Sequence, residues 1–182
     1  QGGQWTFGYD ASGNLCETQD PLGRAESTVW LGHWSLPLVE TDAAGQAWQY
    51  QYDPRGNCVS QTDPLGHVTR YRHDVVGQVV EITNATGKNH RLRWNEVGQL
   101  TEHVDCSGYP TRFEYDRRGH LHVVIDALGE RQRYQHDSQG RLLQAERPYG
   151  HIEHYLRDTC GQLIAYTDAA GQITRYQYDR RG

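Results

Sequence analysis

The sequence lacks long hydrophobic runs and an excess of basic residues, and it contains too few hydrophobic residues to form a thick core. No stretch of about 18 apolar residues occurs in the chain, so no membrane-spanning helix is expected. The net charge of −5 argues against a nucleic-acid partner, because binding to phosphates needs a basic surface. Hydrophobic residues make up only 36% of the 182 residues. This composition fits a thin, largely solvated sheet with one better-packed face.

Glycine, in contrast, is abundant and regularly spaced. Sixteen of the 20 glycines fall on two ladders that repeat every 21 residues. The first ladder consists of Gly13, Gly56, Gly77, Gly98, Gly119, Gly140, Gly161 and Gly182, and the second of Gly23, Gly45, Gly66, Gly87, Gly108, Gly129, Gly150 and Gly171. A fixed period of this size indicates a stacked repeat architecture. We therefore expect one continuous array over residues 1–182, with about eight units.

An aromatic residue and an acid precede most rungs of the first ladder. Clear examples are Tyr52-Asp53-Pro54-Arg55-Gly56 and Tyr115-Asp116-Arg117-Arg118-Gly119, and a second aromatic, Tyr50 or Phe113, lies two residues earlier. This Tyr-x-Tyr-Asp-x-x-Gly spacing resembles the YD repeat of the Rhs family, and the resemblance covers essentially the whole chain. Related repeats occur in the shell subunits of insecticidal toxin complexes and in teneurins. The unit near residues 24–45 departs from the pattern.

The alternation of the two ladders predicts the local structure. Each glycine normally follows an Asp by three residues, which is typical of a turn in which the carboxylate accepts backbone N–H bonds and the glycine adopts positive φ. Between turns lie runs of six or seven residues that are long enough for strands but not for ordinary helices. The prediction is an all-β array of antiparallel hairpins. Accumulated twist bends such an array into a curved strip, part of a cage or barrel wall.

Residue parity predicts two faces for the strip. Trp48, Tyr50 and Tyr52 share one side of their strand. In the alternate strands, the residue two positions after a first-ladder glycine is aliphatic, as at Leu121 and Leu142. We therefore expect an aromatic stripe beside an aliphatic stripe, opposite a mixed polar face.

The four cysteines occupy different phases of the repeat. Cys16, Cys58, Cys106 and Cys160 share no common position, whereas a disulfide framework would recur with the period. Four free thiols are predicted, which indicates folding in a reducing cytosol even if the product is exported later. The first residues contain no signal-peptide regions.

The recurrent polar residues have a catalytic or metal-binding interpretation and a structural one. The turn acids lack the short period of calcium-binding solenoids, so we interpret them as turn formers. The ten histidines show no recurring ligand spacing. Asp20-Pro21-Leu22-Gly23 and Asp63-Pro64-Leu65-Gly66 are similar to the autoproteolytic element of the Rhs core boundary, but Arg24 or His67 follows instead of Leu. We expect structural turns there, no catalytic residue, no cofactor and no metal, and hence no enzyme.

Some aromatics fall outside the periodic positions, namely Trp5, Trp30, Trp34, Tyr109, Tyr149 and Tyr166. Trp30 and Trp34 lie in the irregular unit, which makes them the candidate ligand-binding residues. Rings of this kind can stack on sugars, although periodic rings pack against neighbouring hairpins instead. One hypothesis is therefore an adhesion module that binds carbohydrate or protein through an aromatic face.

The Rhs resemblance implies the main hypothesis. Members of the family build a hollow cage of YD repeats around a toxic C-terminal domain, which bacteria deliver to competitors, often by type VI secretion. The chain would then be a segment of a longer protein, made in the bacterial cytoplasm and then secreted or delivered. Its partners would be the rest of its own chain and secretion-machinery proteins. Open sheet edges also predict self-association.

Overall fold

The computed structural model describes residues 3–32 and 34–179. Gly182, the last rung of the first ladder, and His33, in the irregular unit, lie outside these described residues. The chain divides into two compact units, Gln1–Arg91 and Leu92–Gly182. The boundary falls within strand β9 (Asn89–Trp94), and each unit is described by itself.

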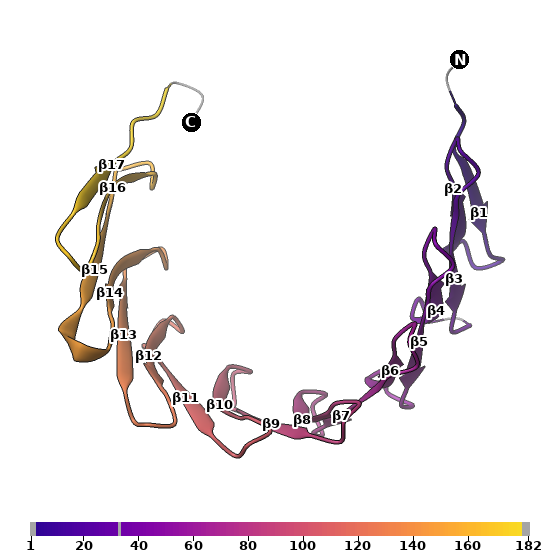
Figure 1. Cartoon of the computed structure of the whole chain (residues 1–182), viewed down its shortest axis with the longest axis horizontal. Coiled ribbons are helices and arrows are strands. Elements are labelled where there is room, and N and C mark those ends of the chain that lie inside the picture. Colours follow the sequence, from indigo (N-terminus) through magenta and orange to yellow (C-terminus); the bar gives the residue numbers. More distant parts are fainter. Residues whose placement is uncertain (1–2, 33, 180–182) are drawn as a thin grey trace. The chain divides into compact units, whose positions relative to one another are not determined.

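Both units consist of strands joined by short turns (Figure 1). The first unit contains β1 (Thr6–Tyr9), β2 (Leu15–Gln19), β3 (Ala25–Trp30), β4 (Pro37–Thr41), β5 (Ala47–Tyr52), β6 (Cys58–Thr62), β7 (Val68–His73), β8 (Val79–Thr83) and the start of β9. The second contains β10 (Leu100–Val104), β11 (Pro110–Tyr115), β12 (Leu121–Ile125), β13 (Arg131–His136), β14 (Leu142–Glu146), the 3-10 turn η1 (Pro148–Gly150), β15 (Ile152–Arg157), β16 (Leu163–Thr167) and β17 (Ile173–Arg175).

Within each unit, every strand pairs antiparallel with its neighbours in the chain. No α-helix is present in the described part of the chain, and none of its helical segments could cross a membrane. The row of strands bends within each unit instead of lying flat (Figure 1). The predicted all-β class and the curved strip of hairpins are confirmed.

The turns form as the Asp-x-x-Gly spacing predicts. At Asp53, the carboxylate Oδ1 accepts the backbone N–H groups of Arg55 (2.8 Å) and Asn57 (2.9 Å). The Gly56 N–H donates to the Asp53 carbonyl (3.0 Å), and Gly56 has φ of +86°. This is a type I turn followed by a residue in the left-handed conformation, which only glycine adopts without strain. The same bonds recur at most turns of both ladders.

The two kinds of hairpin differ by a β-bulge. Hairpins closed by a first-ladder glycine shift register beside the motif aromatic, as at Gln51/Tyr52 and Gln135/His136. Strand pairs joined by a second-ladder turn show no such shift. A bulge bends its strand and increases the local twist, so this bulge, repeated in successive hairpins, contributes to the curvature.

The strip has an aromatic face and a charged face. The aromatic face carries the motif aromatics and the aliphatic residues that pair with them, such as Tyr115 opposite Leu121, so the predicted stripes are confirmed. The charged face carries cross-strand ion pairs, namely Arg72–Glu81 (3.0 Å), Arg93–Glu102 (3.3 Å), Arg112–Glu102 (3.1 Å) and Arg133–Glu146 (3.2 Å).

The core is thin, as the low hydrophobic content predicts. Among the described residues, the buried apolar residues are Val123, which is 4% exposed, and Ala145, which has no exposed surface. Ala145 pairs with Tyr134 on the aromatic face although Leu142, on the same face, pairs with His136. The bulge between these pairs reverses the simple alternation of side chains. The four cysteines are free thiols, with Cys106 and Cys160 exposed.

Candidate functional site

The motif tyrosines tie consecutive hairpins together at one edge of the strip. Tyr52 donates its hydroxyl to the carbonyl of Pro37, the first residue of the preceding strand, at 2.8 Å. Tyr115 bonds to the Leu100 carbonyl in the same way, again at 2.8 Å and 15 residues back. Each of these hydroxyls is therefore used in the scaffold. A buried tyrosine needs such a partner.

Trp30 occupies the same structural position as these tyrosines. It ends β3, follows the register shift at Val29/Trp30, and donates its indole N–H to the Leu15 carbonyl at 2.9 Å, 15 residues back. Our interpretation of Trp30 as an off-period aromatic is therefore wrong. The turn that follows Trp30 contains one extra residue. This insertion shifts Trp30 out of phase with the motif aromatics that come after it in the sequence.

The inserted residue lies in the turn between Leu31 and Leu36. The Leu31 N–H bonds to the Leu36 carbonyl (2.8 Å), five residues on, whereas Asp53 bonds to a carbonyl four residues on. Trp34 N–H donates to the Leu31 carbonyl (2.9 Å), as a first-ladder glycine does in an ordinary turn. The irregular unit is thus an ordinary hairpin with an enlarged apolar turn.

The Trp34 indole lies against Gly56 in the next turn of the same edge. Its Cε3 is 2.9 Å from the position that a β-carbon on Gly56 would take. A hollow of about 220 Å³ adjoins the indole and is lined by Leu31, Gly32, Trp34, Asp53 and Pro54. The structure places Trp30 and Trp34 at the two sides of one turn, but it brings only Trp34 to a hollow. Ligand binding by these residues stays a prediction.

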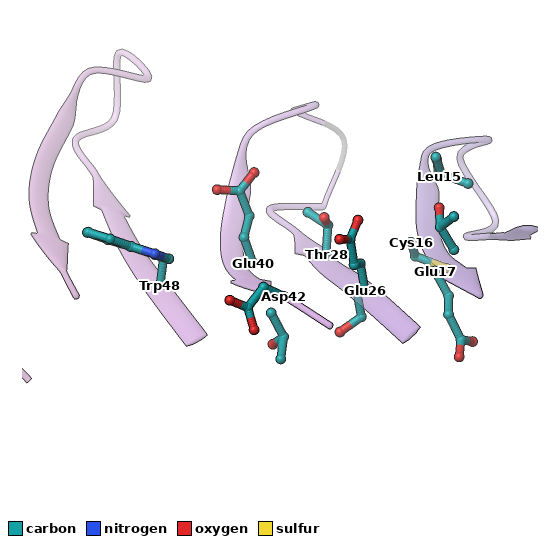
Figure 2. Close-up of a pocket in the computed structure, with 11 residues that line it drawn as sticks. Leu15, Cys16, Glu17, Glu26, Thr28, Glu40, Asp42 and Trp48 are labelled. Carbon is teal, nitrogen blue, oxygen red and sulfur yellow. The ribbon is translucent and has the colours of Figure 1, made fainter. Parts of the chain in front are cut away.

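A larger groove lies on the aromatic face of the first unit, where the row of rings is interrupted. Thr28 occupies the position that Tyr50 holds one unit later, two residues before the strand end. The missing ring leaves a groove of about 360 Å³ across β2, β3, β4 and β5 (Figure 2). Its lining includes Thr18, Glu26, Glu40 and Trp48.

The groove is acidic. Thr28 pairs with Glu40 across the strands, and Glu26 lies two residues from Thr28 on the same face. The Tyr50 hydroxyl donates to Glu40 Oε2 at 2.6 Å. Burial and this bond raise the pKa of Tyr50 to about 12, so the tyrosine stays a donor. In residues 3–32 and 34–179, no ion pair neutralises Glu26 or Glu40, whereas Glu81, Glu102 and Glu146 on the charged face are each paired with arginine.

The repeat itself identifies the family. A model of the RHS repeat matches residues 37–64, 52–88, 94–125, 115–152 and 158–182, together more than half of the chain. The chain belongs to the RHS repeat family. The matches begin at residue 37, so the enlarged turn and strands β2 and β3 of the groove precede the first RHS repeat that the model matches.

Solved structures share the fold of this RHS repeat chain. A crystal structure of TcdB2–TccC3 with Cdc42 matches with a TM-score of 0.54 and 15% identity, over 90% of this chain and 12% of that chain. A TcdB2–TccC3 structure without the hypervariable C-terminal region matches with a TM-score of 0.56 and 15% identity, over 96% of this chain. The chain spans about an eighth of the length of these proteins (12%). No curated protein matches it.

The two Asp-Pro-Leu-Gly elements form the same Asp-x-x-Gly turns as the rest of the chain, as predicted. Asp20 accepts the backbone N–H groups of Leu22 and Arg24 and bonds the Arg24 side chain at 2.6 Å. Desolvation raises the pKa of Asp20, but these hydrogen bonds outweigh it and lower the pKa overall. Asp63 makes the corresponding bonds to Leu65 and His67. Within the described residues, no three His, Cys, Asp or Glu side chains are arranged to hold a metal ion.

The remaining off-period aromatics are distributed over the strip. Trp5, Tyr109 and Tyr149 are largely exposed, whereas Tyr166 packs against Tyr155 with ring centroids 5.2 Å apart. Sequence reasoning missed the groove, because its determining residue is Thr28, a small residue where a ring is expected. The repeat positions of Tyr50 and Tyr71 indicate that a ring belongs at residue 28, but the residue inserted after Trp30 obscured this correspondence.

Proposed function

We propose that the chain is a wall segment of a shell that encloses a toxic C-terminal domain for delivery to competitor cells. The main support for this proposal is that the RHS repeats form a bent strip, in which the motif tyrosines and the recurrent acids are used in turns and cross-strand bonds. Such a strip retains its cargo by enclosure, so the wall needs no catalytic residue of its own.

The fold of the solved neighbours supports this proposal. The strip resembles part of TcdB2–TccC3, a protein that has been crystallised both with Cdc42 and without its hypervariable C-terminal region. A variable segment beyond the repeats is what an exchangeable cargo requires. The open edges, β1 in the first unit and β17 in the second, leave backbone groups that further strands of the shell, or a second copy, would pair with.

Limited proteolysis of the complete protein tests the enclosure. A closed wall should protect the C-terminal domain from protease for as long as the repeats remain folded, and mild denaturant should abolish the protection. The isolated C-terminal domain serves as the control. Equal cleavage rates for the isolated domain and the complete protein would contradict the proposal. Killing of neighbouring bacteria by the producing strain, lost on deletion of the C-terminal domain, tests the delivery step separately.

The adhesion alternative has weaker support. Trp30 uses its indole N–H in the scaffold, which leaves Trp34 and its hollow as the remaining part of that hypothesis. A glycan-array measurement with the chain and with Trp34→Ala tests it. Binding that disappears in the variant would support adhesion, and no binding by either protein would contradict it.

A further inference from the structure

The second unit shows how the aromatic face accommodates a cation. Arg147 takes the turn position that Asp normally holds, and its guanidinium extends over the sheet. Nη1 donates to Gln132 Oε1 at 3.0 Å, and Nη2 donates to Glu153 Oε2 at 3.2 Å. Tyr134 and Tyr155 donate their hydroxyls to the same two oxygens. A guanidinium is thus held between side chains of two strands and beside two tyrosines.

The groove of the first unit keeps one acceptor of this arrangement, Glu26. Glu26 stands four residues before the end of β3, as Glu153 stands four residues before the end of β15. The turn that precedes Glu26 begins with Asp20 instead of an arginine, and Asp20 is bonded within its own turn. Thr28 replaces the tyrosine. The acceptor is therefore present in the groove, while both the guanidinium and the ring beside it are missing.

A second acceptor and an aromatic ring complete the groove. Glu40 lies opposite Thr28, so it is the diagonal neighbour of Glu26, a separation of roughly 7–8 Å between such positions. Tyr50 holds the Glu40 carboxylate in place by a 2.6 Å hydrogen bond. Trp48, directly opposite Glu40 on β5, lines the same groove. The face of an indole attracts cations, and guanidinium groups in particular.

We propose that this groove binds an arginine side chain presented by an extended polypeptide segment. The guanidinium lies between the Glu26 and Glu40 carboxylates and stacks on Trp48. Arginine fits better than lysine because its planar group presents several donors in a fixed fork and so contacts two carboxylates at once. The proposal is independent of the shell function, since it depends only on the groove and its charge complementarity with a cationic segment.

A peptide titration tests the proposal directly. The probes are three five-residue peptides, Ac-Gly-Ser-X-Ser-Gly-amide, with X as arginine, lysine or citrulline, the last being a neutral analogue of arginine. Binding to the whole chain is followed by NMR at the Trp48 indole N–H signal. We expect the arginine peptide to bind most tightly, with an affinity that decreases as salt is added. The citrulline peptide should not bind measurably.

Variants of the groove separate this site from general electrostatic attraction. Glu26→Gln and Glu40→Gln should each weaken arginine binding by about three- to tenfold, the range between exposed and partly buried ion pairs. Thr28→Tyr restores the ring found in other units and should abolish binding by filling the groove. Glu114→Gln, which removes the same charge from the charged face of the second unit, is the matched control and should leave binding unchanged.

Circular dichroism and unfolding curves establish that each variant folds. Failure of the arginine peptide to bind, equal binding of the citrulline peptide, or undiminished binding by folded Thr28→Tyr would each overturn the proposal. Equal losses in Glu114→Gln and Glu26→Gln would show attraction to net charge alone, which also overturns it. Selective binding of an oligosaccharide at Trp48 would identify a sugar as the ligand of the groove and would also overturn the proposal.

Discussion

Replacement of a ladder glycine should cost more stability on one edge of the strip than on the other. Gly56 and Gly66 have nearly the same conformation, with φ of +86° and +83°, and both close Asp-x-x-Gly turns. A β-carbon on Gly66 would meet no atom within 4 Å, whereas one on Gly56 would collide with the Trp34 ring. Gly56→Ala and Gly66→Ala therefore form a matched pair that differs in packing alone.

The expected magnitudes follow from these two contributions. The left-handed conformation costs an L-residue roughly 1–2 kcal/mol, which applies to both variants. Overpacking of a well-filled site adds roughly 1–3 kcal/mol, which applies to Gly56→Ala because the Trp34 ring is rigid and lies 2.9 Å away at Cε3. The difference between the two variants in the free energy of unfolding should thus be about 1–3 kcal/mol.

Urea denaturation followed by circular dichroism measures both free energies of unfolding. The double variant Trp34→Ala/Gly56→Ala supplies the decisive comparison in a double-mutant cycle. Without the indole, Gly56→Ala should cost no more than Gly66→Ala does. Equal destabilisation by Gly56→Ala and Gly66→Ala in the native sequence would refute the packing argument, and so would a Gly56→Ala cost that the loss of Trp34 leaves unchanged.

Three further predictions concern the tyrosines, the turn acids and the cysteines. Tyr52→Phe removes the hydroxyl bond between hairpins and should lower the free energy of unfolding by about 1 kcal/mol, whereas Tyr9→Phe, at a mostly exposed position, should have little effect in the same urea assay. Hydrogen bonds to the Asp137 carboxylate, chiefly the one from the Arg141 backbone N–H, lower the pKa of Asp137 to about 2. The contribution of this carboxylate to stability is therefore present above pH 4 and is lost as the pH falls toward 2. The chain takes up protons when it unfolds in acid, and Asp137→Asn should reduce that uptake by about one proton. An unfolding midpoint that depends on pH as in the native sequence would contradict this. Burial raises the pKa of the Cys58 thiol, so a thiol reagent at pH 8 should label Cys58 more slowly than the exposed Cys160, and equal rates in single-cysteine variants would be evidence against the fold.

The repeat shows how one local device serves several purposes. The bulged turn places the motif aromatic where it contacts the preceding hairpin, as Tyr52 does. The residue after a first-ladder glycine then lies over the glycine of the next turn, as Asn57 lies over Gly77 and Gln99 over Gly119. Second-ladder glycines such as Gly66 have no such neighbour. The two edges of the strip are therefore packed differently although their turn motifs look alike.

The sequence alone determined most of the local structure. Glycine spacing, turn acids such as Asp53 and strand-length runs predict the hairpins, because these preferences act over only a few residues. The YD spacing was also sufficient to indicate the RHS family, and the family model confirms it.

The tertiary structure decided which residues share a face and where the strip is hollow. Bulges reverse the alternation and bring Ala145 under Tyr134, and the inserted residue after Trp30 hides that this indole is a motif aromatic. The groove at Thr28 exists because a ring is missing between neighbouring strands. Such features depend on contacts between residues in different strands, and a linear pattern records only the spacing of residues along one chain.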